Sequence, residues 1–267
     1  MVKLTPCCVR LRLAPMTQEC IICPSKPKGV TYVDTKEVCF LQCPQCSLVW
    51  RTRPEGEMTH YEEAEYFARI GYDDRRAHRV SKSQKQLQVI ERYPLPAKRS
   101  LLEIGCSKGY FLEAAKKRNW EVTGIDISGH AAEHCRKLGF DAHTMDARDI
   151  HKLGRRFGVI VMKHVFEHFN DPIGYLKILH AQLEDKGLIF IDIPHQGYIK
   201  AVLLKEKYKY YNAKHVATQH YFYYLPDNLA AMVEQHGFRV LMKCDPWNSL
   251  LGAFRLTKTF WLIAQKI

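Results

Sequence analysis

The sequence lacks a long uninterrupted apolar run. Although 46% of its 267 residues are hydrophobic, none of its apolar stretches approaches the roughly 18 residues that a membrane-spanning helix needs. The apolar segment of a secretion signal is missing as well, and Lys3, Arg10 and Arg12 are the only charged residues among the first eighteen. We therefore expect no integral membrane segment, a flexible lead-in over residues 1–18, and a cytoplasmic protein.

Acidic residues are in short supply. Lys and Arg outnumber Asp and Glu by 40 to 28, so the net charge is +12, which attracts anions such as nucleic acids or phosphorylated metabolites. The basic residues are scattered over separate segments, however, including Lys116–Arg118 and Arg155–Arg156. Scattered charge is typical of solvated helix faces. The composition is thus compatible with RNA as an alternative partner, but it does not identify a continuous basic surface that would bind RNA.

Cysteine is abundant, with ten residues in a chain that shows no secretion signal. This combination favours thiolates on a metal over a disulfide framework. Cys20 and Cys23 form one CxxC motif, and Cys43 and Cys46 form a second. Two such motifs separated by a short spacer can bring four thiolates to one tetrahedral Zn²⁺. The competing interpretation, a redox-active CxxC, requires a βαβ context that this region lacks.

A zinc ion with four cysteine ligands has no open coordination position, so we expect a structural role for it. The spacer between the two motifs alternates β-branched and aromatic residues, a pattern typical of a short hairpin. Residues 19–50 are thus predicted to form a zinc-binding ribbon. Residues 51–98 are predicted to be a linker with helices at Tyr61–Ile70 and Arg79–Arg92, ended by the prolines before residue 97.

From residue 99 onward, short apolar runs, glycine turns and helices alternate, which indicates a parallel sheet with crossover helices. Ser100–Ile104 is the first predicted strand, Gly105–Gly109 the turn and Tyr110–Arg118 the helix. The next strand, Trp120–Ile125, is followed by Asp126, where a carboxylate can accept hydrogen bonds from ribose hydroxyls. This arrangement predicts a nucleoside-type ligand at the carboxyl ends of the strands.

The dinucleotide-binding fingerprint is missing. It requires glycine at the third and sixth positions after the strand, and Ser107 and Tyr110 stand there instead. The residues that are present, LLEIGCSKGYFL followed by GIDIS, resemble the first two motifs of class I S-adenosylmethionine (SAM)-dependent methyltransferases. That resemblance implies a Rossmann-like α/β fold: a seven-stranded sheet with helices on both faces, alongside the small N-terminal zinc ribbon.

The resemblance extends from about residue 99 to residue 265. It implies strands at Asp141–Thr144, Phe157–Lys163, Gly187–Ile193 and Phe238–Lys243, a helix at Pro226–His236, and an antiparallel last strand at Phe254–Ala264. HVFEHFNDP after the fourth strand is similar to the branch that includes ubiquinone-biosynthesis and sugar methyltransferases. The cofactor-binding residues that it implies are Glu103, Gly105, Cys106, Gly109, Asp126, Ile127, Asp146, Ala147 and Lys163.

Methyl transfer is an in-line displacement that needs alignment, exclusion of water and, for a weakly acidic nucleophile, a base. His164, His168 and His195 follow the fourth and fifth strands and are the candidate catalytic bases. For each of them, a histidine that merely shapes the pocket is the competing interpretation. A metal at His164 and His168 is not expected, because no helix is predicted to align them. The candidate substrate-binding residues are Tyr66, Glu167, His215 and His220.

The leading hypothesis is a SAM-dependent methyltransferase (residues 99–267) that acts on a small or medium metabolite, such as a sugar, a lipid precursor or a natural-product intermediate. A tyrosine-rich insertion at about residues 196–224 is expected to cover the substrate. The alternatives are an RNA or ribosomal-component methyltransferase, favoured by the basic balance and the ribbon, and a non-catalytic SAM-binding scaffold. No particular protein partner is predicted.

Overall fold

The computed structural model describes residues 19–23, 30–33, 39–51, 76–195, 220–243 and 259–267. The predicted helix at Tyr61–Ile70, most of the predicted substrate cover and the start of the predicted last strand lie outside these ranges. Within them, no helix is long and apolar enough to cross a bilayer.

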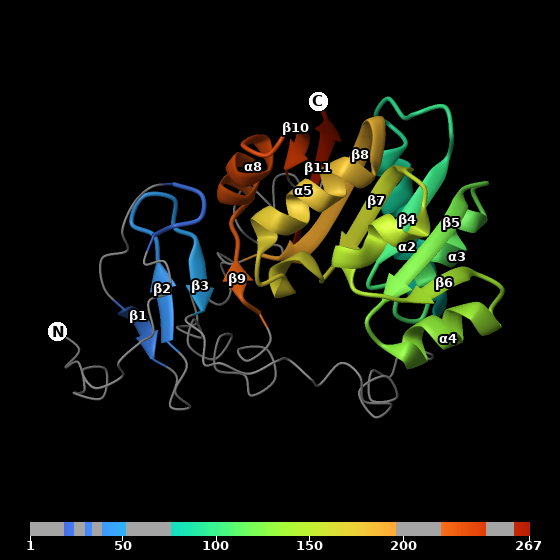
Figure 1. The fold of residues 1–267 in the computed structure, drawn as a ribbon, viewed down its shortest axis with the longest axis horizontal. Helices are drawn as coiled ribbons and strands as arrows, with labels where there is room; N and C mark the ends of the chain where they lie inside the picture. Colours follow the sequence, from blue (N-terminus) through green and yellow to red (C-terminus); the bar gives the residue numbers. More distant parts are fainter. Residues whose placement is uncertain (1–18, 24–29, 34–38, 52–75, 196–219, 244–258) are drawn as a thin grey trace.

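A seven-stranded sheet forms the centre of the molecule, as predicted (Figure 1). Its spatial order is β10-β11-β8-β7-β4-β5-β6, and only β11 runs antiparallel to both of its neighbours. The strands are β4 (Ser100–Ile104), β5 (Glu121–Asp126), β6 (Asp141–Thr144), β7 (Phe157–Lys163), β8 (Leu183–Pro194), β10 (Phe238–Lys243) and β11 (Thr259–Lys266).

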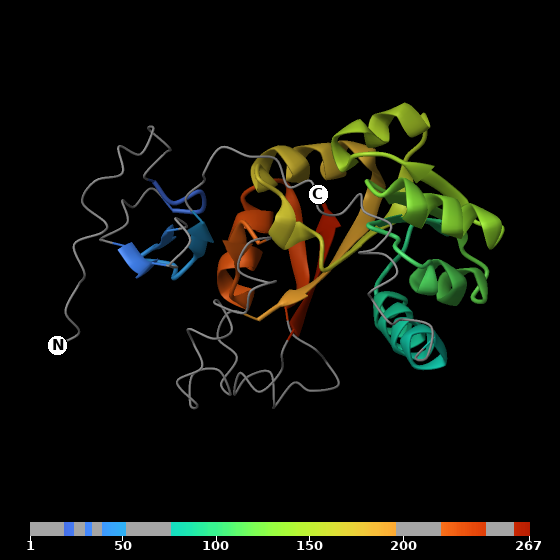
Figure 2. The same ribbon diagram turned by 90° about the horizontal axis from the view of Figure 1, so that it is seen from below.

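Helices cover both faces of this sheet because successive strand residues point to opposite sides. Leu101 of β4 packs in one apolar cluster with helices α2 and α3, whereas Leu102 packs in the other with α5 and α8. Figure 2 shows α2 and α5 on opposite sides of the sheet. The helices are α2 (Arg76–Ile90), α3 (Tyr110–Lys116), α4 (Gly129–Lys137), α5 (Pro172–Gln182) and α8 (Pro226–Glu234).

The element boundaries differ from the predicted ones by a few residues. Helix α2 starts at Arg76, before the predicted Arg79, and β8 starts at Leu183, before the predicted Gly187. The early start of β8 follows from pairing, because Leu183 is already opposite Phe157 of β7 before a register shift brings Leu188 opposite Val159. Sequence pattern cannot locate such an irregularity, because the intervening residues are polar.

A second, four-stranded sheet contains the predicted ribbon and has the order β1-β2-β3-β9. Strands β1 (Val30–Val33), β2 (Cys39–Gln42) and β3 (Val49–Arg51) come from the N-terminal region, but β9 (Phe222–Tyr223) comes from the end of the predicted substrate cover. Figure 1 shows β9 beside β3, between the ribbon and the large sheet. The two predicted domains therefore share a sheet.

Candidate active site and four-cysteine cluster

The turn after β4 is shaped by left-handed backbone. Gly105 and Gly109 have φ of 74° and 72°, and Ser107 between them also has a positive φ of 48°. The N–H groups of Gly105 and Cys106 both donate to the carbonyl oxygen of Ile125, at 2.8 and 3.1 Å, which ties the turn to β5. A Cβ on Gly105 would lie 2.5 Å from Cγ2 of Val165. The turn thus lies directly against the loop after β7.

Asp126 at the end of β5 holds this turn in place. Its Oδ2 accepts a hydrogen bond from the N–H of Ser107 at 2.9 Å, and its Oδ1 accepts one from the N–H of Ser128 at 2.9 Å. Burial raises the pKa of the carboxyl group, while the two backbone donors oppose that rise. The next side chain, Ile127, is 46% exposed, so an apolar surface is available beside the carboxylate.

Glu103 of β4 is a buried acid with an unsatisfied oxygen. The residue is 4% exposed, and its Oε2 has no hydrogen-bond partner among the described atoms. Burial raises its pKa to about 8, although the nearby charge of Lys163 acts in the opposite direction. Lys163 on β7 donates to Oγ of Ser83 at 3.2 Å, and burial lowers its pKa. A buried acceptor of this kind suits a cationic ligand group.

Asp146, predicted beside an adenine, has a carboxylate that is hydrogen-bonded to two residues. It accepts hydrogen bonds from the backbone and guanidinium N–H groups of Arg148 and from the hydroxyl of Tyr175 at 3.2 Å. Burial raises its pKa, but the Arg148 interactions outweigh that effect and the net pKa is lowered. Ala147, which follows it, is buried. Asp146 is therefore ionised and held by its own loop.

Three histidines surround the buried carboxylate of Glu167, which is 2% exposed. The nearest ring nitrogens of His164, His168 and His220 lie 3.7, 4.0 and 3.9 Å from its Oε1. The rings of His168 and His220 meet edge to face, with centroids 4.7 Å apart. His220 comes from the far end of the predicted cover, and the N–H of Tyr221 donates to the Glu167 carbonyl at 2.9 Å.

The charge states within this Glu167 cluster differ. Burial alone would raise the pKa of Glu167, but the histidines outweigh it and the net pKa is lowered, so the carboxylate is ionised. Burial lowers the pKa of His220 to about 4, so this ring is neutral at physiological pH. For His164, burial is outweighed by Glu167, and its pKa is raised above the ordinary 6.5. His164 is also the most exposed of the three side chains, at 49%.

Backbone geometry explains the position of His164. It follows β7 with a left-handed φ of 56°, and its N–H donates to the Asp192 carbonyl of β8 at 2.7 Å. A 3-10 helix at Phe166–His168 then brings Glu167 inward. From the sequence, no metal is expected at His164 and His168. A different set, Glu167, His168 and His220, brings one ligand atom from each residue within 4.8 Å of the others.

Of the remaining candidate catalytic and substrate-binding residues, only His195 falls within the described ranges. His195 is 3% exposed and meets the Phe260 ring of β11 edge to face, at 5.5 Å between centroids. That environment favours the packing interpretation for His195 over catalysis. Tyr66 and His215 fall outside the described residues.

The sequence did not predict a group of polar side chains that lies between α2 and the sheet. Asp192 of β8 is fully buried and lies in register with Lys163 of β7, and its Oδ2 accepts a hydrogen bond from Gln86 of α2 at 2.8 Å. Lys82 of the same helix lies 3.8 Å from that oxygen. The sequence carried one usable signal, because Ser83 and Gln86 are polar on the face of α2 that is otherwise apolar and buried. Helix α2 thus covers the Glu103 end of the site.

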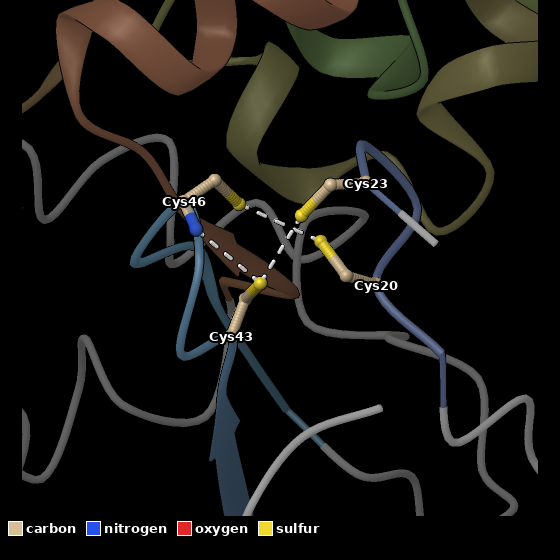
Figure 3. A group of neighbouring side chains, drawn as sticks. All are labelled: Cys20, Cys23, Cys43 and Cys46. Carbon is tan, nitrogen blue, oxygen red and sulfur yellow. Dashed lines mark hydrogen bonds between the residues drawn. The ribbon is translucent and has the colours of Figure 1, made fainter. Parts of the chain in front are cut away.

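The four predicted zinc ligands come together in the ribbon (Figure 3). Sγ of Cys20 lies 3.6 Å from Sγ of Cys46, and Sγ of Cys23 lies 3.2 Å from Sγ of Cys43. All four sulfurs lie within 4.8 Å of one another. The N–H of Cys46 donates to the Cys43 sulfur at 3.4 Å, and a hydrogen bond from the Cys46 thiol lowers the pKa of Cys20 to about 5.

Residues 64–243 match a protein family described as a methyltransferase domain. This match covers more than half of the chain. The chain belongs to the methyltransferase family. The resemblance found in the glycine turn and the second-strand acid is therefore confirmed, and the protein is a class I SAM-dependent methyltransferase.

Curated relatives of this methyltransferase include the ubiquinone biosynthesis O-methyltransferase of Coxiella burnetii, 26% identical over 171 residues, or 58% of this chain and 70% of the relative. Among solved structures, a SAM-dependent methyltransferase from Archaeoglobus fulgidus has a TM-score of 0.53 at 19% identity, covering 70% of this chain and 94% of that chain. The plantazolicin methyltransferase BamL, solved with SAH, has a TM-score of 0.51 at 19% identity, covering 76% and 88%. These structures share the fold of the methyltransferase.

Proposed function

We propose that the protein transfers the methyl group of SAM to a small or medium metabolite, such as a sugar, a lipid precursor or a natural-product intermediate. The observation that carries this proposal is the contact between the glycine turn and the loop after β7. Because Gly105 has room only for a hydrogen atom beside Val165, a cofactor on the turn lies next to His164 and the Glu167 cluster. A cofactor end and an acceptor end thus meet at one edge of the sheet.

The cofactor end uses residues whose geometry fits SAM. Its sulfonium supplies an activated methyl group. The unsatisfied Glu103 oxygen suits the ammonium of the methionine part, and Asp126, with Ile127 exposed beside it, suits the ribose and the adenine face. Gly105, Cys106 and Gly109 form the close-packed turn beneath the cofactor, and Lys163 balances the charge of Glu103. In this scheme Asp146 and Ala147 form the adenine side of the pocket.

At the acceptor end, His164 is the proposed base. A base works best when its pKa lies near the working pH, and Glu167 raises the pKa of His164 toward that range. Glu167 also orients the ring and stabilises the imidazolium that forms when the acceptor loses its proton. His168 and neutral His220 also lie within 4.0 Å of Oε1 of this carboxylate. Activity with and without an added divalent cation separates this proton-handling role from a metal-holding role of the same cluster.

Small acceptors are supported by the names of similar proteins. These include the ubiquinone biosynthesis O-methyltransferase, and a magnesium protoporphyrin IX methyltransferase of Synechocystis with a TM-score of 0.50 at 14% identity. Because the identities are low, they support a class of acceptor rather than a particular compound.

The four-cysteine cluster is the proposed site of a structural Zn²⁺, held by Cys20, Cys23, Cys43 and Cys46. Thiolates at the observed separations can surround one tetrahedral ion with Zn–S distances of about 2.3 Å. Four sulfur ligands leave no coordination position for substrate, so the ion would contribute stability rather than chemistry.

This thiol site is compatible with a reducing compartment, for which we propose the cytoplasm. We retain residues 19–50 as the ribbon, 51–98 as the linker with helices and 99–267 as the catalytic domain.

The acceptor class can be tested with methyl-labelled SAM and three fractions of cell extract: small molecules, lipids and RNA. We expect label in the small-molecule or lipid fraction, and its loss in an Asp126→Ala variant. Label in RNA, together with RNA affinity that falls steeply with salt, would support the RNA alternative instead. Label in no fraction while SAM still binds would support the scaffold alternative.

A further inference from the structure

The four-cysteine ribbon reaches the acceptor end of the site through a strand pairing. Strand β3 directly follows the second CxxC motif and pairs antiparallel with β9, Val49 opposite Tyr223 and Trp50 opposite Phe222. His220 lies two residues before β9. The residue between them, Tyr221, donates its N–H to the carbonyl oxygen of Glu167 at 2.9 Å. The strand that completes the ribbon sheet therefore begins where the Glu167 cluster is held.

A buried side chain forms a second connection. Asn228 in the first turn of α8 is 3% exposed. Its amide nitrogen donates to the carbonyl oxygen of Cys46 at 3.2 Å, and its amide oxygen accepts from the N–H of Leu225 at 3.0 Å. The same amide thus caps α8 and binds the backbone of a predicted zinc ligand. Because both ends of the amide are satisfied, the second CxxC turn is fixed against the catalytic domain.

The apolar core continues across the same boundary. Cys43, Leu48 and Trp50 of the ribbon belong to one buried cluster with Phe166 and Tyr224. Tyr224 is fully buried, and its ring lies 5.8 Å from that of Phe166, the neighbour of Glu167 in the chain. The N-terminal strands of this sheet are only three or four residues long, so a metal at the four-cysteine site would add rigidity to β3 where it pairs with β9.

We propose that the metal-loaded four-cysteine site is a positioning device for the acceptor end: by fixing β3, and through it β9, it holds His220 against Glu167 and His168. This inference rests on the proposed function and its zinc site. The cofactor end has separate support, since the turn is tied to β5 by the hydrogen bonds of Gly105 and Cys106 to Ile125. Removing the metal should therefore loosen the acceptor end before the cofactor end.

The test is hydrogen exchange on the full-length protein before and after zinc is removed with a chelator, with zinc content and SAM affinity measured on the same samples. We expect amide exchange at residues 221–223 to speed up by about tenfold or more, which corresponds to local destabilisation of about 1.4 kcal/mol. Exchange in β4 and β5, and SAM affinity, should stay within about twofold.

A matched pair of variants tests the connection between the ribbon and β9 without removal of the metal. Asn228→Ala deletes the bond to Cys46 and should speed up exchange at residues 221–223 while zinc content is retained. Asp227→Asn alters the adjacent residue, which is 85% exposed and pairs with Lys243 at the surface, and should leave that exchange unchanged.

Three results would overturn the inference. The first is unchanged exchange at residues 221–223 after zinc is lost. The second is parallel loss of SAM binding and of protection in β4, which would mean general unfolding. The third is a purified protein without zinc, which also overturns the zinc proposal. A zinc-loaded protein that behaves as expected but transfers no methyl group leaves the inference standing and counts against the proposed function.

Discussion

His164 is the residue on which the proposed chemistry depends most. Replacing it with Gln keeps a similar shape but removes the base, so we expect kcat to fall by about 10²- to 10⁴-fold. SAM affinity should be unchanged, because the ring contacts Glu167 rather than the proposed cofactor residues. Single-turnover methyl transfer and SAM titration measure the two effects separately. A fall in SAM affinity that accounts for the lost activity would contradict a role as base.

The charge of His164 predicts a pH dependence. Because its pKa is raised above the ordinary 6.5, the base is protonated and inactive at low pH. We expect kcat to rise with pH through a value above 6.5 and that limb of the profile to vanish in His164→Gln. A profile limited only near pH 4 would instead identify His220, whose pKa is lowered to about 4.

Glu103 predicts a second pH effect, on stability. Its folded-state pKa of about 8 lies above its ordinary 4.5, so its contribution to stability is present below about 4.5 and is lost as pH rises through about 8. In the cofactor-free protein, Glu103→Gln should therefore flatten the decline of Tm over this interval. It should also weaken SAM binding by about 10- to 100-fold if the carboxylate meets the ammonium. An unchanged Tm profile would contradict the burial argument.

Only some of the individual site residues could be placed from the sequence. Asp126 and the glycine turn could be placed from the sequence because their spacing along a strand–turn–helix unit is fixed by local geometry. Asp192 and Gln86 could not, because they meet only when α2 folds over β8. His220 was assigned to substrate binding, and nothing local shows that it faces Glu167.

The glycine turn is the element with the clearest steric requirement. Gly105→Ala would place a methyl group 2.5 Å from Val165 at a left-handed φ of 74°. We expect the turn to shift and SAM affinity to fall by about tenfold or more, equivalent to 1.4 kcal/mol. Gly139→Ala is the matched control, because its φ of 78° imposes the same backbone strain of about 1–2 kcal/mol with nothing within 4 Å of the new methyl group.

Both glycine variants should lose the stability that the left-handed backbone costs, Gly105→Ala should lose more because of the Val165 contact, and only Gly105→Ala should bind the cofactor more weakly. Thermal unfolding and SAM titration on both proteins give the comparison. Equal SAM affinity in Gly105→Ala and the wild type would mean that the turn does not carry the cofactor.

Element positions were predictable where hydrophobic periodicity is strong. The buried strands β4 and β7 match their predicted bounds, since each is a short, mostly apolar run that ends at a turn. Strand β9 was missed because it is two residues long and exists through its pairing with β3. The sequence pattern places its one tyrosine, Tyr223, in the substrate cover.

At the scale of the whole molecule, the fold and the ribbon form one connected structure. The seven-stranded sheet provides a cofactor end at β4 and β5 and an acceptor end after β7, and β9 joins the ribbon to the latter. The alternation of apolar runs, glycine turns and helices predicted the parallel sheet, and the resemblance to class I methyltransferases implied its antiparallel last strand. They could not show that the ribbon shares a strand with the catalytic domain, because that contact joins segments far apart in the chain.

The most direct test of the central claim is an experimental structure of the protein with SAH. The account predicts the ribose hydroxyls at Asp126, the amino group at Glu103 and the sulfur open toward His164 and Glu167. An SAH molecule bound at this edge with its sulfur facing away from the Glu167 cluster, or bound elsewhere on the sheet, would contradict the account.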